Sequence, residues 1–207
     1  MDPRPLLAIL SESRELGYLG PGELQTHLTH ALGFAFAAES ALGRAPASFV
    51  DLGTGGGIPG LVLAGAWPTA TGFLVETTRR RCVSLAQWVE QLGLSGATVV
   101  EGRAEELAHR PDLREAAEVV VARGFGPPAA TAEVATGFCS PGGVVVVSEP
   151  PGGDPTRWPE PLLLELGLGP ARPFLSETAA YVVIEKMLPA SERLPRRRAQ
   201  PWKRPSW

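Results

Sequence analysis

The chain of 207 residues has few of the residue types that build metal centres and disulfide frameworks. It contains 2 cysteines and 3 histidines, and neither Cys82 nor Cys139 lies in a CxxC pair. A disulfide scaffold and a cysteine metal site are therefore poorly supported, and we expect two buried free thiols. His27 and His30 are spaced to share one helix face. Because no third ligand is visible, we interpret them as a surface or core pair rather than a metal site.

A long hydrophobic run is also missing. No apolar stretch approaches the ~20 residues of a membrane-spanning helix, and residues 1–10 lack the basic start and apolar core of a signal peptide. We therefore expect a cytoplasmic protein with no membrane partner. Hydrophobic residues make up 44% of the chain, which is ordinary for a globular protein, and the length fits one domain with a real core.

Lysine is nearly absent, since only Lys186 and Lys203 are lysines among 19 basic residues. This arginine bias makes arginine abundance weak evidence for function. The net charge of −3 nevertheless hides a basic end, because residues 191–207 hold one acid, Glu192, and these basic residues: Arg193, Arg196, Arg197, Arg198, Lys203 and Arg204. A basic tail on an acidic body is typical of nucleic-acid contact, and a merely solvated tail is the alternative.

The most informative segment that is present is a glycine-rich loop after an apolar run. Residues 48–63 read SFVDLGTGGGIPGLVL. Such a loop lets bare backbone and a helix N-terminus approach a small ligand closely. The spacing is not the GxGxxG dinucleotide fingerprint, and no Walker lysine follows, so phosphate binding is disfavoured. Simple turn formation remains the alternative for the glycines.

Strand and helix patterns alternate along most of the chain. This alternation predicts βαβ units in one doubly wound, mostly parallel α/β sheet, with residues 1–190 as a single domain, residues 1–45 as its helical cap and 191–207 as a tail. We predict parallel strands at 48–52, 71–75, 97–101, 118–122 and 144–148, and a closing antiparallel pair at 174–176 and 181–187. Helices are predicted at 5–16, 22–42, 58–66, 79–92, 105–110, 127–138 and 162–166.

Acidic residues stand at the ends of successive predicted strands. Asp51 ends the first strand, Glu76 ends the second, and Glu105 follows the third. An acid at the second position can accept both hydroxyls of a ribose, and a group after the third can reach an adenine edge. Together they describe an adenosine site. S-adenosylmethionine suits it, because its sulfonium and ammonium cations fit an acid such as Asp51 near the loop.

Four segments, FVDLGTGGGIPGLVLA, VETTRRR, GRAEEL and VVARGFGPPAATAEVATGFCSPGG, resemble the RsmG (GidB) family, bacterial enzymes that methylate a guanine N7 of small-subunit (16S) ribosomal RNA. The resemblance covers residues 27–148, and PRRRAQPWKRP resembles the family's basic, proline-rich end. It implies a class I, Rossmann-like methyltransferase fold, S-adenosyl-L-methionine as cofactor, and ribosomal RNA or the small ribosomal subunit as partner. We expect a monomer without a metal.

The resemblance also implies site residues. It places cofactor contacts on Gly53, Ile58, Ala104, Glu105 and Arg123, which join those named from the strand ends and the loop, Asp51, Gly55 and Glu76. Arg80 and Arg81 match a lysine-arginine pair of the family, and a solvated helix start is the alternative for them. With the tail they give the predicted RNA contacts: Arg80, Arg81, Arg196, Arg197, Arg198, Lys203 and Arg204.

We name no catalytic acid or base. The N7 atom of guanine carries an exposed lone pair, so methyl transfer to it requires alignment and no proton removal. One departure from the family leaves the acceptor open: the strand after PGG ends in Ser148-Glu149-Pro150, where the family usually has a lysine-glycine pair. A methyltransferase with a different acceptor, either a small molecule or another RNA, and a non-catalytic S-adenosylmethionine-binding regulator are the alternatives.

Overall fold

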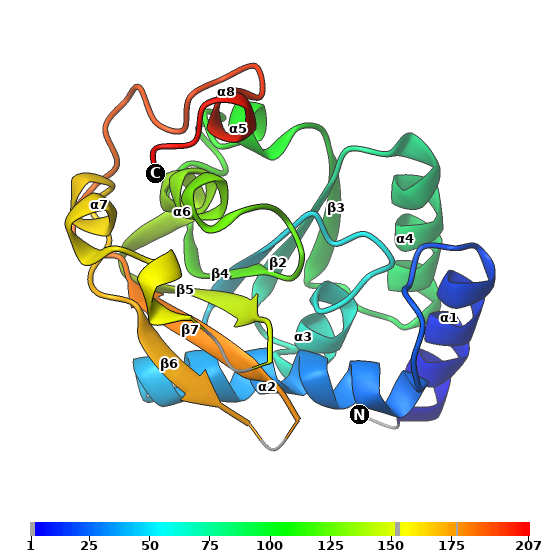
Figure 1. The fold of residues 1–207 in the computed structure, drawn as a ribbon. Coiled ribbons are helices and arrows are strands. Elements are labelled where there is room, and N and C mark those ends of the chain that lie inside the picture. Colours follow the sequence, from blue (N-terminus) through cyan, green and yellow to red (C-terminus); the bar gives the residue numbers. More distant parts are fainter. Residues whose placement is uncertain (1–2, 152–153, 177) are drawn as a thin grey trace.

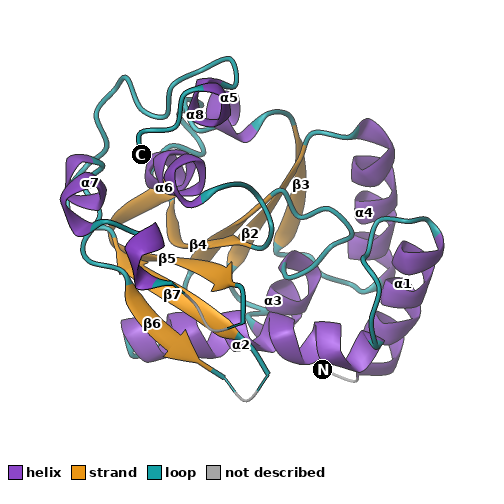
Figure 2. Ribbon diagram, viewed as in Figure 1, coloured by secondary structure: helices purple, strands orange, loops and turns teal. Residues whose placement is uncertain are grey.

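The computed structural model describes residues 3–151, 154–176 and 178–207. Its centre is a seven-stranded sheet in the order β3-β2-β1-β4-β5-β7-β6, with helices on both faces (Figure 1, Figure 2). The predicted α/β class with a doubly wound sheet is confirmed. The strands are β1 (Ser48–Leu52), β2 (Thr71–Glu76), β3 (Ala97–Glu101), β4 (Ala117–Ala122), β5 (Cys139–Glu149), β6 (Arg172–Leu175) and β7 (Ala180–Glu185).

Strands β1 to β5 are parallel, whereas β7 runs antiparallel to both β5 and β6. The valine run of β4, Val119 to Val121, is fully buried because helices cover both faces there. The chain builds the sheet outward from β1 through β2 and β3, then returns to place β4 on the other side of β1. This reversal leaves a crevice at the carboxyl ends of β1 and β4, which is where α/β folds bind ligands.

The helices form two layers with separate hydrophobic clusters. One cluster includes Phe34 and Trp88 and lies under α1 (Pro3–Glu15), α2 (Leu24–Leu42), α3 (Gly60–Ala66) and α4 (Arg79–Gln91). The other includes Phe138 and Leu163 and lies against the opposite face of the sheet. Its helices are α5 (Ala104–Leu107), α6 (Pro128–Phe138), α7 (Glu160–Glu165) and α8 (Gln200–Lys203), and a 3-10 helix, η1 (Pro155–Arg157), precedes α7.

Strand β5 differs most from its predicted bounds. It begins at Cys139, before the Pro-Gly-Gly sequence that predicts a turn. The backbone N–H of Gly142 donates to the carbonyl of Lys186, and the N–H of Lys186 donates to the carbonyl of Gly143. The strand therefore continues through the glycines because they pair with the chain that leaves β7. The closing antiparallel pair is confirmed, although β6 begins two residues earlier than predicted, at Arg172.

Residues 191–207, called the C-terminal segment below, pack onto α5 and α6 (Figure 1). The Nε2 of His109 donates to the carbonyl of Pro195 at 2.8 Å, and Arg114 donates to the carbonyl of Leu194 at 2.9 Å. The segment also contains the short helix α8, which the sequence does not predict. What the sequence presents as a tail is thus a folded part of the domain.

Candidate cofactor-binding site

The loop between β1 and α3 takes its shape from glycines. Gly53, Gly55 and Gly57 have φ angles of +66°, +58° and +94°, a region that residues with a side chain rarely adopt. The loop is closed by a hydrogen bond from the N–H of Gly57 to the carbonyl of Thr54 at 2.9 Å. At its end, Ile58 is buried in the hydrophobic cluster of the α1 to α4 layer. The glycine pattern is therefore a backbone requirement of this loop.

Asp51 lies beneath the loop and is almost completely buried. Its Oδ2 accepts the N–H of Gly60, the first residue of α3, at 2.8 Å. Burial raises the pKa of the Asp51 carboxyl to about 7. The structure thus uses Asp51 to join the end of β1 to the start of α3, close under the glycine loop.

Glu76 ends β2 and faces the same loop. Its Oε1 accepts the N–H groups of Thr77 and Thr78, each at 2.8 Å, and its Oε2 accepts the N–H of Gly55 at 3.1 Å. Burial acts to raise the pKa of Glu76, but the hydrogen bonds from Thr78 and the charge of Arg81, 3.6 Å away, hold that pKa below its usual value. Glu76 is therefore a fixed, ionised carboxylate beside the loop.

A pocket of about 220 Å³ opens where four parallel strands end. The residues that follow β1, β3 and β4 contribute glycines, which leave the space open. A Cβ on Gly53 would lie only 2.9 Å from the ring of Phe125 across the pocket. The lining residues are Gly53, Val75, Glu76, Thr77, Arg81, Gly102, Ala104, Gly124 and Phe125.

Ala104 and Glu105 begin α5, and their side chains have different surroundings. Ala104 lines the pocket, whereas the Glu105 side chain is only 1% exposed. The Glu105 carboxylate accepts the Nε–H of Arg103 at 2.5 Å and the backbone N–H of Ala199 at 3.0 Å. Glu105 therefore joins the pocket edge to the C-terminal segment, a contact across 94 residues that no local pattern reveals.

Arg123 follows β4 and points toward α2. Its guanidinium donates to Nδ1 of His27 at 2.9 Å, and Nε2 of His27 donates to the carbonyl of Gly20 at 3.2 Å. Burial, together with the charge of Arg123, lowers the pKa of His30 to about 4. His30 is therefore neutral beside Arg123, and the contact with His27 fixes Arg123 at the strand ends. In the described ranges, no group of three or more His, Cys, Asp and Glu residues could hold a metal ion.

The predicted RNA contacts occupy two places near the pocket. Arg80 and Arg81 lie in the first turn of α4, and their guanidinium groups lie 5.7 and 5.5 Å from the ring centroid of Tyr18. In the C-terminal segment, Arg196 pairs with the fully buried Glu133, and Arg197 lies 3.4 Å from Glu106.

Arg198, Lys203 and Arg204 are exposed parts of the same segment. Arg196 is therefore committed to an internal contact, unlike these three residues. The run of basic residues in the sequence does not show which side chain is paired internally, because that pairing depends on the distant acid Glu133.

Glu149, where the related family usually has lysine, is internally paired. Its carboxylate accepts Nη1 of Arg157 at 2.6 Å and Nε1 of Trp158 at 3.1 Å. The Glu149 side chain is only 4% exposed, whereas that of Arg157 is 33% exposed. The acid at the end of β5 is thus neutralised by a cation from η1 rather than presented as a negative charge to an acceptor.

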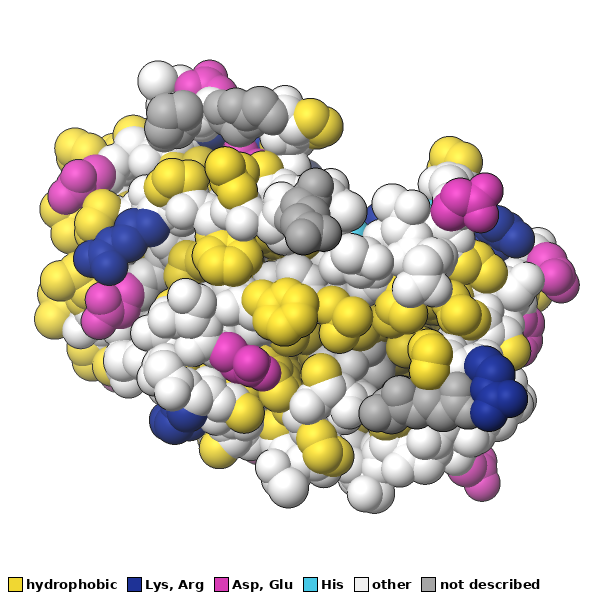
Figure 3. Space-filling view, turned by 90° about the horizontal axis from the view of Figure 1, so that it is seen from below, with side chains coloured by type: hydrophobic (Ala, Val, Ile, Leu, Met, Phe, Trp, Pro, Cys, Tyr) yellow, Lys and Arg dark blue, Asp and Glu magenta, His cyan; other side chains and the backbone are white. Residues whose placement is uncertain are grey.

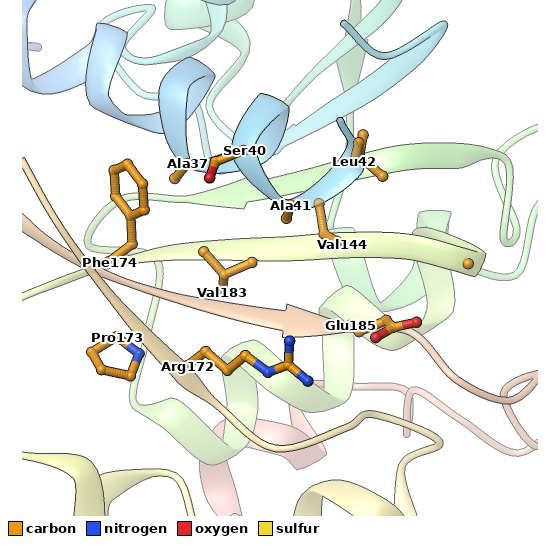
Figure 4. Close-up of a pocket in the computed structure, with 11 residues that line it drawn as sticks. Ala37, Ser40, Ala41, Leu42, Val144, Arg172, Pro173, Phe174, Val183 and Glu185 are labelled. Carbon is orange, nitrogen blue, oxygen red and sulfur yellow. The ribbon is translucent and has the colours of Figure 1, made fainter. Parts of the chain in front are cut away.

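A larger hollow, of about 320 Å³, lies elsewhere on the molecule. Figure 4 shows Phe174, Val183 and Arg172 on one side of it and residues of α2 on the other. It also includes Val144, at the beginning of the parallel part of β5, and therefore lies at the end of the sheet opposite to the strand ends that bind ligands. Seen from below the view of Figure 1, hydrophobic side chains gather among scattered charges of both signs (Figure 3). We place the functional site in the smaller pocket.

Comparisons with known proteins show the family to which the chain belongs. The family described as rRNA small subunit methyltransferase G, or GidB, matches residues 19–149, from the residues before α2 to the end of β5. The chain belongs to the rRNA small subunit methyltransferase G family. The predicted membership is confirmed, and the matched range contains every residue that lines the pocket.

Two curated relatives carry the name ribosomal RNA small subunit methyltransferase G. The one from Gloeobacter violaceus is 38% identical over 100 residues, which is 48% of this chain and 40% of the relative. The one from Moorella thermoacetica is 31% identical over 166 residues, 77% of this chain and 69% of the relative. The chain thus spans well under half of the first relative and about two thirds of the second.

Among solved structures, a putative O-methyltransferase from Klebsiella pneumoniae has the same fold. It aligns with a TM-score of 0.65 at 13% identity and covers 91% of each chain. This chain therefore has the class I methyltransferase fold that the sequence predicts.

The pocket residues fit the methyl donor that the sequence predicts for this family. Gly53, Gly102 and Gly124 form a cradle without side chains, and Phe125 supplies an apolar ring opposite Gly53. Glu76 places an ionised carboxylate at one side of this cradle. A nucleoside needs these three elements, namely close backbone approach, an apolar surface for the base and an acceptor for ribose hydroxyls.

Proposed function

We propose that the protein is an S-adenosylmethionine-dependent methyltransferase that methylates N7 of a guanine in small-subunit ribosomal RNA. The observation that carries the proposal is the pocket at the ends of β1 to β4, with the fixed carboxylate of Glu76 beside the glycine loop. The family match over residues 19–149 supports the activity, because its members are named ribosomal RNA small subunit methyltransferases.

Different residues of the pocket would hold different parts of the cofactor. Glu76 would accept the ribose hydroxyls, and Ala104 with Phe125 would enclose the adenine. The backbone around Gly53 and Gly55 would face the amino-acid part, with Asp51 beneath it as the nearby acid. When bound, the cofactor supplies a methyl group on a positively charged sulfur. Arg123, fixed by His27, would stand at the strand end where cofactor and acceptor meet.

The acceptor nitrogen needs no general base. Guanine N7 has a lone pair in the plane of the ring, so the protein must only align it with the methyl group. The carboxylate of Glu76, which lines the pocket, already accepts the N–H groups of Gly55, Thr77 and Thr78, and we assign it to the ribose rather than to proton removal. The internal neutralisation of Glu149 by Arg157 also removes an acid that would repel a phosphate backbone.

The RNA would lie across the arginine-rich rims of the pocket. Arg80 is exposed on one rim, and Arg198, Lys203 and Arg204 are exposed on the C-terminal segment. Phosphate contacts release counterions, so binding should weaken as salt rises, and the triple change of these three C-terminal residues to glutamine should reduce that salt dependence. Unchanged affinity and salt dependence would remove the segment from the RNA site.

We further propose that the protein acts as a monomer in the cytoplasm, where ribosomal subunits are assembled. In the described ranges, no helix is long and apolar enough to cross a membrane. A charged surface of arginines suits an RNA partner.

The proposal is tested with labelled S-adenosylmethionine and three acceptors from cells that lack the gene: small ribosomal subunits, protein-free small-subunit RNA, and a small-molecule extract. We expect label in RNA, recovered as 7-methylguanine, and none in the small-molecule fraction. Label only among small molecules would indicate a different acceptor. Cofactor binding without transfer to any fraction would indicate a binding protein.

A further inference from the structure

The C-terminal segment reaches the wall of the cofactor pocket through one aromatic residue. The ring of Trp202 packs on Phe125, with ring centroids 5.4 Å apart and planes inclined by 69°. Phe125 itself lines the pocket. The guanidinium of Arg103, just before α5, lies 5.9 Å from the Trp202 ring centroid. Trp202 therefore stands directly behind one pocket residue and beside the turn that carries another, Ala104.

The space around Phe125 leaves it few alternative positions. A Cβ on Gly126 would lie 2.8 Å from Nε1 of Trp202, so glycine is needed there for the tryptophan to approach. A Cβ on Gly53 would lie 2.9 Å from the Phe125 ring. Phe125 thus lies close to the glycine loop and in contact with Trp202.

The backbone before Trp202 bonds to the first turn of α5. Arg198 and Ala199 both have a φ of +57°, an unfavourable conformation for residues with a side chain, and it aims their N–H groups at α5. The N–H of Arg198 donates to Glu106 at 2.9 Å, and that of Ala199 donates to Glu105 at 3.0 Å. Because Ala104 precedes these acids in the same turn and lines the pocket, the segment holds a second part of the pocket wall.

The segment is anchored strongly enough to act as a support. The carboxylate of Glu133, on α6, has no exposed surface and accepts both the backbone N–H and the Nε–H of Arg196, each at 2.8 Å. Arg196 thus fixes the segment on the body of the domain shortly before Trp202.

We propose that Trp202 is a positioning residue for the cofactor pocket: it holds Phe125 and the Ala104–Glu105 turn in the arrangement that receives the adenosine part of the cofactor. The inference rests on the proposed function. In addition to any RNA contact, the C-terminal segment then supports the wall of the cofactor pocket. It also implies that RNA held by Arg198 or Lys203 acts on the same element that supports the cofactor site.

The test is the affinity for S-adenosylhomocysteine, measured by calorimetry, of the full chain and three variants. We expect Trp202→Ala to bind roughly three- to tenfold more weakly, the range that corresponds to the loss of an aromatic pair. Trp202→Phe keeps a ring against Phe125 and should restore most of the affinity. Gly126→Ala should weaken binding as Trp202→Ala does, because the added Cβ would lie 2.8 Å from Nε1 of Trp202 and displace its ring.

The matched control is Trp207→Ala, which removes a tryptophan from the same segment at a place away from the pocket. Thermal melting of all variants separates loss of stability from loss of the site. Equal affinity of the Trp202→Ala variant and the wild-type chain, or equal weakening by Trp207→Ala, would overturn the inference. If Trp202→Ala does not fold, Trp202→Phe and Gly126→Ala decide the question. A wild-type chain that binds no S-adenosylhomocysteine would instead contradict the proposed function.

Discussion

The glycine loop after β1 and the C-terminal segment lie on two sides of the same pocket but are held in different ways. The loop is short and local: its conformation depends on positive φ angles at Gly53, Gly55 and Gly57, and its hydrogen bonds reach the ends of neighbouring strands. The C-terminal segment is held by two buried acids, Glu105 and Glu133, that are more than 60 residues away in the chain.

The wall of a binding pocket can thus be held in place in two ways. In the loop, backbone conformation sets the shape, so a single added side chain changes the site directly. In the segment, ion pairs and packed rings set the position, so a change acts through the support before it reaches the pocket. The two regions should therefore respond differently to mutation: a side chain added to the loop changes cofactor affinity directly, whereas a change in the segment reaches the pocket only through its support.

The largest expected loss of stability comes from the anchor of the C-terminal segment. Arg196→Met leaves the carboxylate of Glu133 buried without its charge partner. Removing one member of a buried ion pair costs about 3 to 5 kcal/mol, and because the Arg196 side chain is 36% exposed we expect the free energy of unfolding in denaturant to fall by about 3 kcal/mol. The control is Arg197→Met, whose pair with Glu106 is exposed and should contribute less than about 1 kcal/mol. Equal losses in the two variants would show that Arg196 is not an anchor.

Asp51 provides a test of the loop that depends on pH. Burial raises its pKa to about 7 from 3.8, so the folded chain binds a proton that the unfolded chain has released between these values. The contribution to stability is therefore full below about pH 4 and is lost as pH rises toward 7. Asp51→Asn should remove this loss, amounting to about 2 to 4 kcal/mol at pH 8.

Denaturant unfolding of wild-type and Asp51→Asn chains at pH 5 and pH 8 measures this effect. The exposed Asp112→Asn serves as the control, since a surface carboxylate should leave the pH dependence of the wild type in place. An Asp51→Asn chain that loses as much stability between pH 5 and pH 8 as the wild type would refute the assignment.

Gly53→Ala tests whether the loop acts on the pocket directly. The new Cβ would lie 2.9 Å from Phe125, and φ at this position is +66°. Gly93→Ala is a matched control, because its φ is +62° but its Cβ would meet nothing within 4 Å. Both changes should cost about 1 to 2 kcal/mol of stability through backbone strain. Only Gly53→Ala should weaken S-adenosylhomocysteine binding, by about tenfold or more in calorimetry.

The smallest effect is expected at the contact between the N-terminal helices and the loop. The hydroxyl of Ser13, on α1, donates to the carbonyl of Gly56 at 3.0 Å and is buried. Ser13→Ala should lower the free energy of unfolding by about 1 kcal/mol, since one buried carbonyl loses its partner. Ser11→Ala, on the exposed side of the same helix, should change it by no more than about 0.5 kcal/mol. Thermal melting distinguishes the two.

The fold and half of the site could be predicted from the sequence, and the two regions explain why. The strands, the glycine loop and Glu76 produce local patterns of alternation, glycine spacing and strand-end acids. The support by Trp202, the pairing of Glu149 with Arg157 and the contact of Arg123 with His27 join residues that local patterns do not connect. Glu105 belongs to both kinds: its position after a strand is visible in the sequence, but its bond to Ala199 is not.

Calorimetric titration with S-adenosylhomocysteine shows whether the cofactor binds in the pocket at the ends of β1 to β4. Glu76→Ala removes the carboxylate from this pocket, while Glu185→Ala removes one from the larger hollow between α2 and the edge strands. We predict that Glu76→Ala weakens binding by about a hundredfold or more and that Glu185→Ala leaves it unchanged. Normal binding by Glu76→Ala, or a loss confined to Glu185→Ala, would show that the cofactor binds outside this pocket.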